Sequence, residues 1–333
     1  MARQRVTLEQ VAKAAGVSRA TVSLVVRDSP LVADETREKV QRTMAALDYV
    51  RDIGAARLRS NSSRTIGLIV PNLVNPFFTE FLSGVEQVMG DQDRVVLLAD
   101  SHDDPLRQDA ILQRFRGHGV DGVILCPAQT SDPDLLTRMR LWNLPVVQAL
   151  REIGPGHGDY AGADYRDGIL QALRHLRNLG HRDIAFLSVT ADTSARTERS
   201  VGFAQALAQT GTRNAGIIEA DLTWDAAEQS AAEILATRAT AVLCFNDVLA
   251  AGLILGLRRA GTKPGRDISV VGLDDLPLAR MMHPALTSVA VHPRRIGNEA
   301  AALLGRRLRD PSIVPGRSIL PTQLIVRDST GRI

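Results

Sequence analysis

The apolar positions along the chain follow two different spacings. In the first fifty residues they recur three and four places apart, for example at Leu8, Val11, Ala12 and Ala15, which is the period of an amphipathic helix. From about residue 65 onward, short continuous apolar runs alternate with helical stretches, a pattern typical of parallel strands covered by helices on both faces. The pattern predicts a small all-α unit followed by a larger α/β unit.

Two short helices joined by a tight turn are predicted near the N-terminus. Thr7 can cap the first helix, with the Gln10 side chain reaching back to it. Gly16 is placed to end this helix in the left-handed conformation, and Ser18 can cap a second helix that begins at Arg19. Because the turn is so short, the two helices must cross steeply.

The second of these helices has one apolar and one polar face. Val22, Val25 and Val26 can pack against the first helix, and a third helix fits residues 34–49. The outward positions hold an arginine and short side chains, namely Arg19, Ala20 and Ser23. Such residues at the start of an exposed helix suit the reading of base edges in a DNA major groove. Spacing alone is equally compatible with a helical hairpin that has no DNA role.

The remainder of the chain predicts two similar α/β lobes. Apolar runs indicate strands at residues 66–70, 95–99, 122–125 and 146–147, and again at 184–187, 216–218, 241–245 and 268–273. The rhythm restarts after Asp164, so we place the division between the lobes near residue 163. Ligands of parallel sheets bind beyond the carboxyl ends of the strands, and the cleft between two facing lobes is therefore the expected site.

Length and composition agree with a globular chain of several domains. The 333 residues exceed the usual size of one core, 44% are apolar, and no apolar run is long enough to span a bilayer. The first residues lack the apolar segment of a secretion signal, so we expect a cytoplasmic protein without a membrane partner. Cys126 and Cys244 each end an apolar run, which predicts buried thiols and neither a disulfide nor a metal site.

Positive charge is concentrated in the helical N-terminal part. The net charge is only +3, but residues 1–64 hold 12 Arg or Lys and 7 Asp or Glu, whereas the remainder holds 28 and 30. This distribution supports a nucleic-acid contact by the N-terminal unit, although a solvated basic face would show the same excess.

Signals for catalysis or cofactor binding are poor. Residues 117–122 fit the pattern G-x-G-x-x-G, but they precede a predicted strand, whereas a dinucleotide loop follows a strand and opens a helix. The chain has no P-loop lysine, no H-E-x-x-H and no G-x-S-x-G motif, and its 7 histidines show no metal-ligand spacing. We predict no catalytic residues, no cofactor and no metal, and hence no enzyme.

Polar residues at predicted strand ends are the candidate ligand contacts. Those that directly follow an apolar run are Asp100, Asp164, Asn246, Asp247 and Asp274. Carboxylates and amides at these places can hydrogen-bond to hydroxyl groups. Arg199 opens a predicted helix after a strand, and Trp224 has the same place relative to its own strand.

Several segments resemble the lactose/galactose repressor family. Residues 6–18, 21–23 and 36–40 are similar to the DNA-binding headpiece of that family. Residues 75–78, 119–124, 179–185, 199–203, 246–247 and 271–275 are similar to its periplasmic-binding-protein-like core. The resemblance covers nearly the whole chain.

The resemblance implies an all-α helix-turn-helix headpiece followed by a two-lobed α/β core of doubly wound parallel sheets. It places the DNA-binding domain at residues 1–49 and a hinge at 50–64. The first lobe would comprise residues 65–163 and 292–320, and the second 164–291 and 321–333. The chain ends too early for the C-terminal helix that makes tetramers of some relatives, so a homodimer on a pseudo-palindromic operator in double-stranded DNA is expected.

For the DNA contact, the resemblance implicates the start of the second helix and the hinge. The headpiece residues are Thr7, Ser18, Arg19, Ala20, Thr21, Ser23 and Leu24, and the hinge residues are Arg57, Leu58 and Arg59. Leu58 lies where the family inserts a leucine into the minor groove, although a lone apolar residue there could also pack on the next domain. Leu24 departs from the family, which commonly has arginine at this position, so one base or phosphate contact is lost or replaced by an apolar one.

For the small-molecule effector, the resemblance suggests that Arg199 and Asp274 bind hydroxyl groups and that Trp224 stacks on a sugar ring. Phe77 and Phe78 would form an apolar wall, although aromatic residues beside strands are more often core. A pentose, hexose or glycoside is favoured, and a nucleoside or purine stays open. The sequence does not tell whether the effector induces or corepresses.

The function predicted from the sequence is therefore a ligand-responsive transcriptional repressor. A cytoplasmic sugar-binding or sugar-processing protein without a DNA role is the alternative. A nicotinamide enzyme would need a phosphate loop that the sequence lacks.

Overall fold

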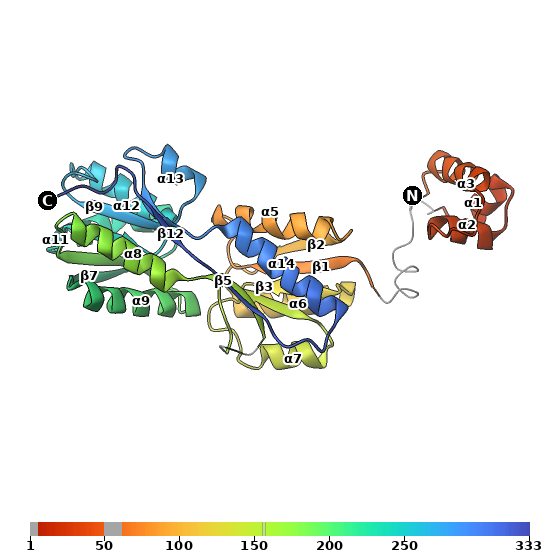
Figure 1. Cartoon of the computed structure of the whole chain (residues 1–333), viewed down its shortest axis with the longest axis horizontal. Helices are drawn as coiled ribbons and strands as arrows, with labels where there is room; N and C mark the ends of the chain where they lie inside the picture. Colours follow the sequence, from red (N-terminus) through yellow and green to blue (C-terminus); the bar gives the residue numbers. More distant parts are fainter. Residues whose placement is uncertain (1–5, 50–61, 155, 157) are drawn as a thin grey trace. The chain divides into compact units, whose positions relative to one another are not determined.

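The computed structural model describes residues 6–49, 62–154, 156 and 158–333. The chain forms two compact units, Met1–Ser63 and Arg64–Ile333, which we call the headpiece and the core (Figure 1). Within the described residues no helix is both long and apolar enough to cross a membrane.

The described part of the headpiece consists of α1 (Leu8–Ala15), α2 (Arg19–Val26) and α3 (Asp34–Ala46). Thr7 and Gln10 form the predicted capping box of α1, and Gly16 ends that helix in the left-handed conformation at φ 64°. The Ser18 hydroxyl accepts a hydrogen bond from the Thr21 N–H at 3.0 Å and so caps α2. Local sequence signals thus set both ends of the turn between α1 and α2.

A small apolar core holds the three headpiece helices together. It is formed by buried residues from every helix, among them Val11, Ala15, Val22, Val25 and Val40. The third helix was expected to reach residue 49, but it ends at Ala46. Asp48 takes a left-handed conformation, and the chain then turns so that the Tyr49 N–H bonds to the Met44 carbonyl.

The described part of the core contains two six-stranded sheets with the order β11-β5-β4-β3-β1-β2 and β12-β10-β9-β8-β6-β7. The first sheet is formed by β1 (Thr65–Val70), β2 (Val95–Asp100), β3 (Gly122–Leu125), β4 (Val146–Ala149), β5 (Asp159–Ala163) and β11 (Arg317–Leu320). The second is formed by β6 (Asp183–Val189), β7 (Arg213–Ala220), β8 (Ala241–Cys244), β9 (Ser269–Asp274), β10 (Thr287–Ala290) and β12 (Gln323–Ile325). The two sheets therefore share one topology, except that β11 pairs parallel with β5 and β12 pairs antiparallel with β10.

Helices cover both faces of the first sheet (Figure 1). They are α5 (Phe77–Gly90), α6 (Pro105–His118), α7 (Leu135–Leu141) and α14 (Pro293–Arg309). Alternate strand residues face the two sides, so that Leu68 packs on the side of α5 and α14, whereas Ile69 packs on the side of α6 and α7. Helices α5 and α14 touch at two glycines: a Cβ on Gly84 would lie 2.0 Å from the Arg294 carbonyl oxygen, and one on Gly297 would lie 2.2 Å from that of Phe81.

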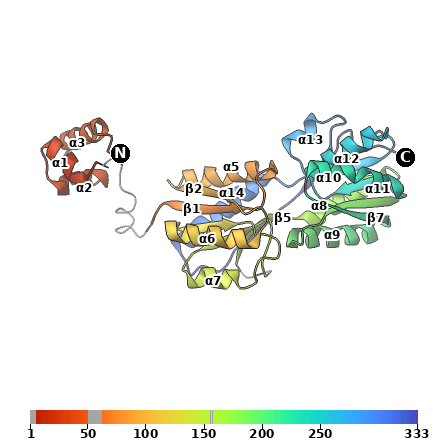
Figure 2. The same ribbon diagram turned by 180° about the vertical axis from the view of Figure 1, so that it is seen from behind.

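The second sheet is covered in the same manner. Its helices are α8 (Tyr165–Asn178), α9 (Ser194–Thr210), α10 (Trp224–Gln229), α11 (Ala231–Ala236), α12 (Asp247–Arg259) and α13 (Pro277–Met281). Helices α8 and α9 pack together on one face, and α10 and α12 pack together on the other (Figure 2).

The thiols of Cys126 and Cys244 are free and buried at the ends of their apolar runs, as the sequence predicted.

Within the described residues, the chain passes from one sheet to the other three times. It crosses between β5 and α8, between β10 and α14, and between β11 and β12. The strands β5, β10, β11 and β12 that border these crossings were not predicted from the sequence. They are short and carry few large apolar side chains, as in the Asp-Tyr-Ala-Gly-Ala run of β5, so that pairing with a neighbouring strand and not hydrophobic patterning makes them strands.

Candidate functional site

The N-terminal turn of α2 presents a polar surface on the headpiece. Arg19 and Ala20 are exposed, and Thr21 and Ser23 are half-buried. The Ser18 and Thr21 hydroxyls lie 2.9 Å apart at the cap, which holds both side chains at the helix end. A basic side chain followed by short ones leaves room for the edge of a base pair.

Two further predicted contact residues have structural roles within the headpiece. The exposed Thr7 forms the α1 cap, with its N–H 2.8 Å from the Gln10 side-chain oxygen. Leu24 is half-buried and packs against the headpiece core, so only part of it is accessible to a partner. The hinge residues Arg57, Leu58 and Arg59 lie outside the described residues.

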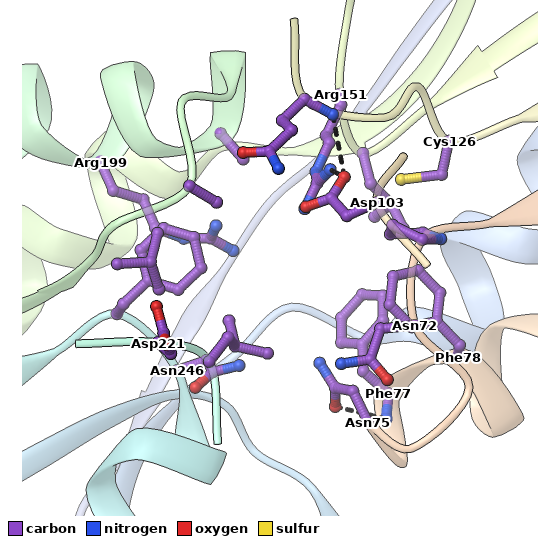
Figure 3. Close-up of a pocket in the computed structure, with 18 of the residues that line it drawn as sticks. Asn72, Asn75, Phe77, Phe78, Asp103, Cys126, Arg151, Arg199, Asp221 and Asn246 are labelled. Carbon is purple, nitrogen blue, oxygen red and sulfur yellow. Dashed lines mark hydrogen bonds and ion pairs between the residues drawn. The ribbon is translucent and has the colours of Figure 1, made fainter. Parts of the chain in front are cut away.

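A cavity of about 530 Å³ lies between the two lobes of the core, at the carboxyl ends of the strands (Figure 3). Phe77 and Phe78, in the first turn of α5, form an apolar wall on the first-lobe side. Their rings meet edge to face, with centroids 5.5 Å apart. The Asn75 side-chain oxygen accepts a hydrogen bond from the Phe77 N–H at 3.0 Å, which fixes the start of the helix.

An ion pair forms the polar part of the first-lobe wall. Arg151 approaches Asp103 with both terminal nitrogens, at 2.5 and 3.3 Å from the two carboxylate oxygens. Asp103 also accepts from the Gln129 N–H at 2.9 Å. Both charges of this pair are thus compensated before any ligand binds.

Arg199, the sixth residue of α9, dominates the second-lobe wall. Its side chain is buried, and its guanidinium carbon lies 4.0 Å from the ring centroid of Tyr165 and 4.1 Å from that of Phe245. Stacking between two aromatic rings stabilises the cation and keeps its plane fixed. The Nε atom is buried without a hydrogen-bond partner among the described residues, so a donor is left over for a ligand.

Asp274 ends β9 beside this arginine and also lines the cavity. Its side chain is only 3% exposed, and its Oδ1 atom has no hydrogen-bond partner among the described residues. Burial raises the pKa of the Asp274 carboxyl well above its usual value, and the nearby Arg199 charge opposes this shift. The backbone of Asp274 has φ 120°, a conformation that non-glycine residues rarely adopt.

Asn246 and Asp221 complete the polar lining on the second lobe. The Asn246 side-chain oxygen caps α12 by accepting from the Leu249 N–H at 3.0 Å, which commits the oxygen and turns the amide nitrogen towards the cavity (Figure 3). Asp221 accepts from the Thr190 hydroxyl at 2.7 Å. Donors and acceptors therefore surround the cavity on this side, opposite the phenylalanine wall.

Four residues predicted from strand ends do not line the cavity. Asp100 accepts hydrogen bonds from the Leu73 and His102 N–H groups and so shapes the loop after β2. Asp164 caps α8 through the Asp167 N–H at 3.0 Å. These two carboxylates are occupied by backbone donors, and the expectation that they face a ligand does not fit their placement.

Asp247 and Trp224 do not line the cavity either. Asp247 is fully buried behind the lining, where it accepts from the Ser288 hydroxyl and from the Leu276 N–H. Burial raises the pKa of Asp247 to about 7, and the two hydrogen bonds oppose this shift. Trp224 is 39% exposed at the start of α10, while the preceding Leu222 and Thr223 line the cavity. Both predictions lie one position too far along the chain, because the residues that line the cavity are those nearer the strand ends, Thr223 before Trp224 and Asn246 before Asp247.

Sequence reasoning missed other lining residues altogether. They include Asp103, Arg151, Tyr165, Asp221 and Phe245. Phe245 directly follows the strand β8, so an earlier strand boundary would have identified it. Asp103 and Arg151 lie in the loops that follow β2 and β4, and only the tertiary structure brings them together.

The lining suits binding rather than covalent chemistry. Cys126 is the nucleophilic side chain on the wall, and burial raises the pKa of its thiol to about 12. Within the described residues, no cluster of three or more His, Cys, Asp or Glu side chains could hold a metal ion. What the cavity offers is a stacked cation, a neutral or anionic acid, an amide and an apolar wall, a combination that binds hydroxyl groups and the faces of small rings.

Two segments of the chain match known families. Residues 7–52 match the family described as bacterial regulatory proteins, lacI family, and residues 173–330 match a periplasmic binding protein-like domain. The HTH-type transcriptional repressor PurR of Photobacterium profundum is 32% identical over 330 residues, which cover 97% of this chain and 98% of that protein.

Solved structures are similar over the same extent. A lac repressor dimer bound to operator and the anti-inducer ONPF has a TM-score of 0.90 at 26% identity, covering 98% of this chain and 100% of that chain. A complex of the transcriptional regulator CelR with cellobiose has a TM-score of 0.74 at 30% identity, with the same coverage of 98% and 100%.

Proposed function

The chain belongs to the lacI family of bacterial regulatory proteins, and from this premise we propose that a small polyhydroxylated molecule in the cleft controls its affinity for operator DNA. The family places it among helix-turn-helix transcriptional repressors with a ligand-binding core, and its relatives are regulators rather than enzymes. The identity of the ligand, the contact residues and the dimer are the parts we propose.

The observation that carries the proposal is the pair of unused polar atoms in the cleft. Arg199 Nε and Asp274 Oδ1 are buried and lack hydrogen-bond partners among the described residues. A buried polar atom without a partner costs roughly 1–3 kcal/mol, a cost that a ligand hydroxyl removes by donating to one group and accepting from the other. A hydroxyl-bearing ligand thus supplies what the protein lacks at this place.

A sugar fits this lining better than a charged molecule does. The Asp103–Arg151 pair is already neutral, and Asp274 lies beside Arg199, so that opposite charges face each other on both walls. The cavity volume of about 530 Å³ lies within the range typical of small-molecule sites. The CelR structure contains cellobiose, which favours a sugar, and a nucleoside or purine is the second candidate.

The headpiece supplies the proposed DNA contact. Arg19 and Ala20 on the exposed start of α2 approach base edges, Ser23 lies one turn further on, and Ser18 and Thr21 contact phosphates. Leu24 contributes at most a peripheral apolar contact, because it is half-buried. Arg57, Leu58 and Arg59 remain the proposed hinge contacts.

We propose a homodimer as the DNA-binding form. The edge strand β2 leaves Val95 63% exposed, Leu97 36% and Leu98 38%. An exposed apolar edge strand is a liability unless another surface covers it, and a second copy of the chain would do so. Two headpieces would then read the two halves of a pseudo-palindromic operator.

Binding of ligand and DNA are coupled in this proposal because the ligand touches both lobes. A ligand that fits one arrangement of the lobes better shifts the protein towards it, and the shift changes the affinity of the headpieces for DNA. The coupling is reciprocal, so operator DNA must change the affinity for the ligand by the same factor.

The test has two steps. Thermal-shift screening of pentoses, hexoses, disaccharides and nucleobases on the full chain should find a compound that raises the melting temperature, because it binds only the folded core. That compound should then change the affinity for duplex DNA selected from a random library. A hit that leaves DNA affinity unchanged at every salt concentration would contradict the coupling.

The same experiment addresses a sugar-binding protein without a DNA role. A regulator that contacts phosphates loses affinity for duplex DNA steeply as salt rises, because binding releases counterions. Absence of saturable DNA binding by the full chain at low salt would favour the alternative.

A further inference from the structure

A second cavity, of about 320 Å³, lies at the junction of the two lobes. One wall is formed by the first turn of α14 and by Glu80 of α5, which belong to the first lobe. The opposite wall is formed by the segment that follows β9, by α13 and by Arg327, which belong to the second lobe. Asp274 lines both this cavity and the first one.

Four arginines converge on this cavity: Arg280, Arg294, Arg295 and Arg327. Arg327 is neutralised by the protein itself, because its Nη2 atom lies 2.6 Å from Asp275 Oδ1 and its Nη1 atom donates to the Leu286 carbonyl at 2.7 Å. Its side chain is only 18% exposed. It therefore has a structural role at the base of the cavity.

The other three arginines are poorly compensated. Arg294 Nε lies 3.7 Å from Glu80 Oε2, with the two side chains 58% and 38% exposed, and a pair so long and so exposed contributes little. Arg280 and Arg295 are exposed, and no carboxylate lies within ion-pair distance of either among the described residues. Three guanidinium groups thus surround a space that lacks matching negative charge.

The N-terminus of α14 adds positive potential to the same space. This 17-residue helix starts at Pro293, and His292 at its N-cap has φ 57° and makes no side-chain cap hydrogen bond. Pro293 has no N–H, and the Ile296 N–H donates to the His292 carbonyl at 3.1 Å. The N–H groups of Arg294 and Arg295 therefore remain for an outside acceptor, and the helix dipole places partial positive charge there. An anion in the cavity would accept from these N–H groups and from the guanidinium groups together.

The acidic residues that line this cavity do not neutralise the three arginines. Asp275 is committed to Arg327, and Glu80 lies at the exposed rim. The Asp274 carboxyl lies beside the Arg199 cation of the first cavity, which offsets its charge. We propose that this second cavity binds a small phosphate monoester, held by Arg280, Arg294, Arg295 and the first turn of α14.

Such a ligand would bridge the lobes. Arg294 and Arg295 belong to the first lobe and Arg280 to the second, so a phosphate that contacts all three favours one arrangement of the lobes. Because Asp274 separates the two cavities, occupancy of one changes the wall of the other. The proposal itself does not depend on what occupies the first cavity.

Isothermal titration of the full chain with glycerol 3-phosphate, inorganic phosphate and glycerol tests the proposal. The titrations are carried out at constant ionic strength in a buffer without phosphate. Glycerol 3-phosphate should bind saturably at one site per chain, inorganic phosphate more weakly, and glycerol not at all. Equal affinity for the two phosphates would overturn the assignment to a monoester, and the absence of saturable binding would overturn the site.

Variants locate the binding. Arg280→Gln and Arg295→Gln should each weaken glycerol 3-phosphate binding on the order of tenfold, because each removes a charge-assisted hydrogen bond. Arg309→Gln, at the exposed far end of the same helix, is the matched control and should leave the affinity unchanged.

Melting temperatures measured without phosphate establish that each variant is folded. Unchanged affinity in both folded arginine variants would overturn the proposal. An equal loss in the Arg309→Gln control would do the same, because it would show that general positive charge and not this cavity attracts the phosphate.

Discussion

Arg19 in the headpiece and Arg199 in the core are held in opposite ways. Arg19 lies exposed at the start of a short helix, without a hydrogen bond or ion pair among the described residues. Arg199 is buried between two aromatic rings that come from different elements of the core. The first is positioned by a local cap and leaves its side chain open to a large, hydrated partner, whereas the second is positioned by tertiary packing for a small one.

The largest expected effect is on the buried arginine. Arg199→Met should weaken binding of the ligand found by the thermal screen by about 3 kcal/mol, because a charge-assisted contact is lost and ligand hydroxyls are left unpaired. Methionine keeps the space between the rings filled. Titration calorimetry measures the loss, and DNA affinity without ligand should not change. Unaltered ligand affinity would remove Arg199 from the site.

A second test uses a buried carboxyl of the core, that of Asp247. In the described part of the headpiece, by contrast, all Asp and Glu residues are exposed. The folded-state pKa of Asp247 is raised from 3.8 to about 7. Its contribution to stability is therefore complete below pH 3.8 and is lost as the pH rises through about 7. Between pH 5 and 7 the free energy of core unfolding should fall by about 2 kcal/mol from this group.

Asp247→Asn supplies the control for that pH dependence. Asparagine has nearly the same shape and does not titrate, so the slope between pH 5 and 7 should flatten. Denaturant unfolding of the full chain at several pH values measures it. An equally steep slope in the variant would assign the dependence to other groups.

The exposed arginine gives the third effect. Arg19→Ala should reduce specific DNA binding by about 1–3 kcal/mol if the side chain pairs with a guanine, while ligand binding stays unchanged. Arg42→Ala, exposed on α3, is the control. Fluorescence anisotropy with operator and random duplexes measures the difference, and equal weakening on both would reduce Arg19 to a phosphate contact.

The smallest effect concerns the cap that positions α2. Ser18→Ala should destabilise the headpiece by about 1 kcal/mol, because the Thr21 N–H loses its acceptor, whereas Ser18→Gly should cost only a few tenths. Hydrogen exchange of headpiece amides measures this loss separately from the core. Equal exchange in wild type and Ser18→Ala would show that the cap contributes nothing to α2.

The same contrast explains how much the sequence could predict. The headpiece helices follow from neighbouring residues, such as Thr7 with Gln10 and the glycine at position 16, and these predictions were confirmed except for the last turn of α3. The α/β class of the core followed from its alternating runs and was also confirmed. Apolar periodicity and helix caps both depend on residues that are close together in the chain, which is why the sequence predicts them.

The lining of the cleft is harder to predict from the sequence, because its residues are far apart in the chain. Phe77, Phe78, Arg199, Asn246 and Asp274 were predicted and do line the cavity. Asp247 follows the correct strand but points behind the lining, since the α12 cap uses the residue before it. The ion pair between Asp103 and Arg151 joins residues that are 48 positions apart, and no local sequence pattern predicts it.

The three crossings between the sheets also limit how the core can come apart. A protease that nicks the chain after β5 would leave the lobes tied through the two remaining crossings. Neither lobe is a continuous stretch of sequence, so truncation at residue 163 would remove α14 and β11 from the first lobe and leave its sheet without an edge strand. When one lobe moves relative to the other, the three connecting segments must change conformation together. This favours a single rotation of one lobe against the other.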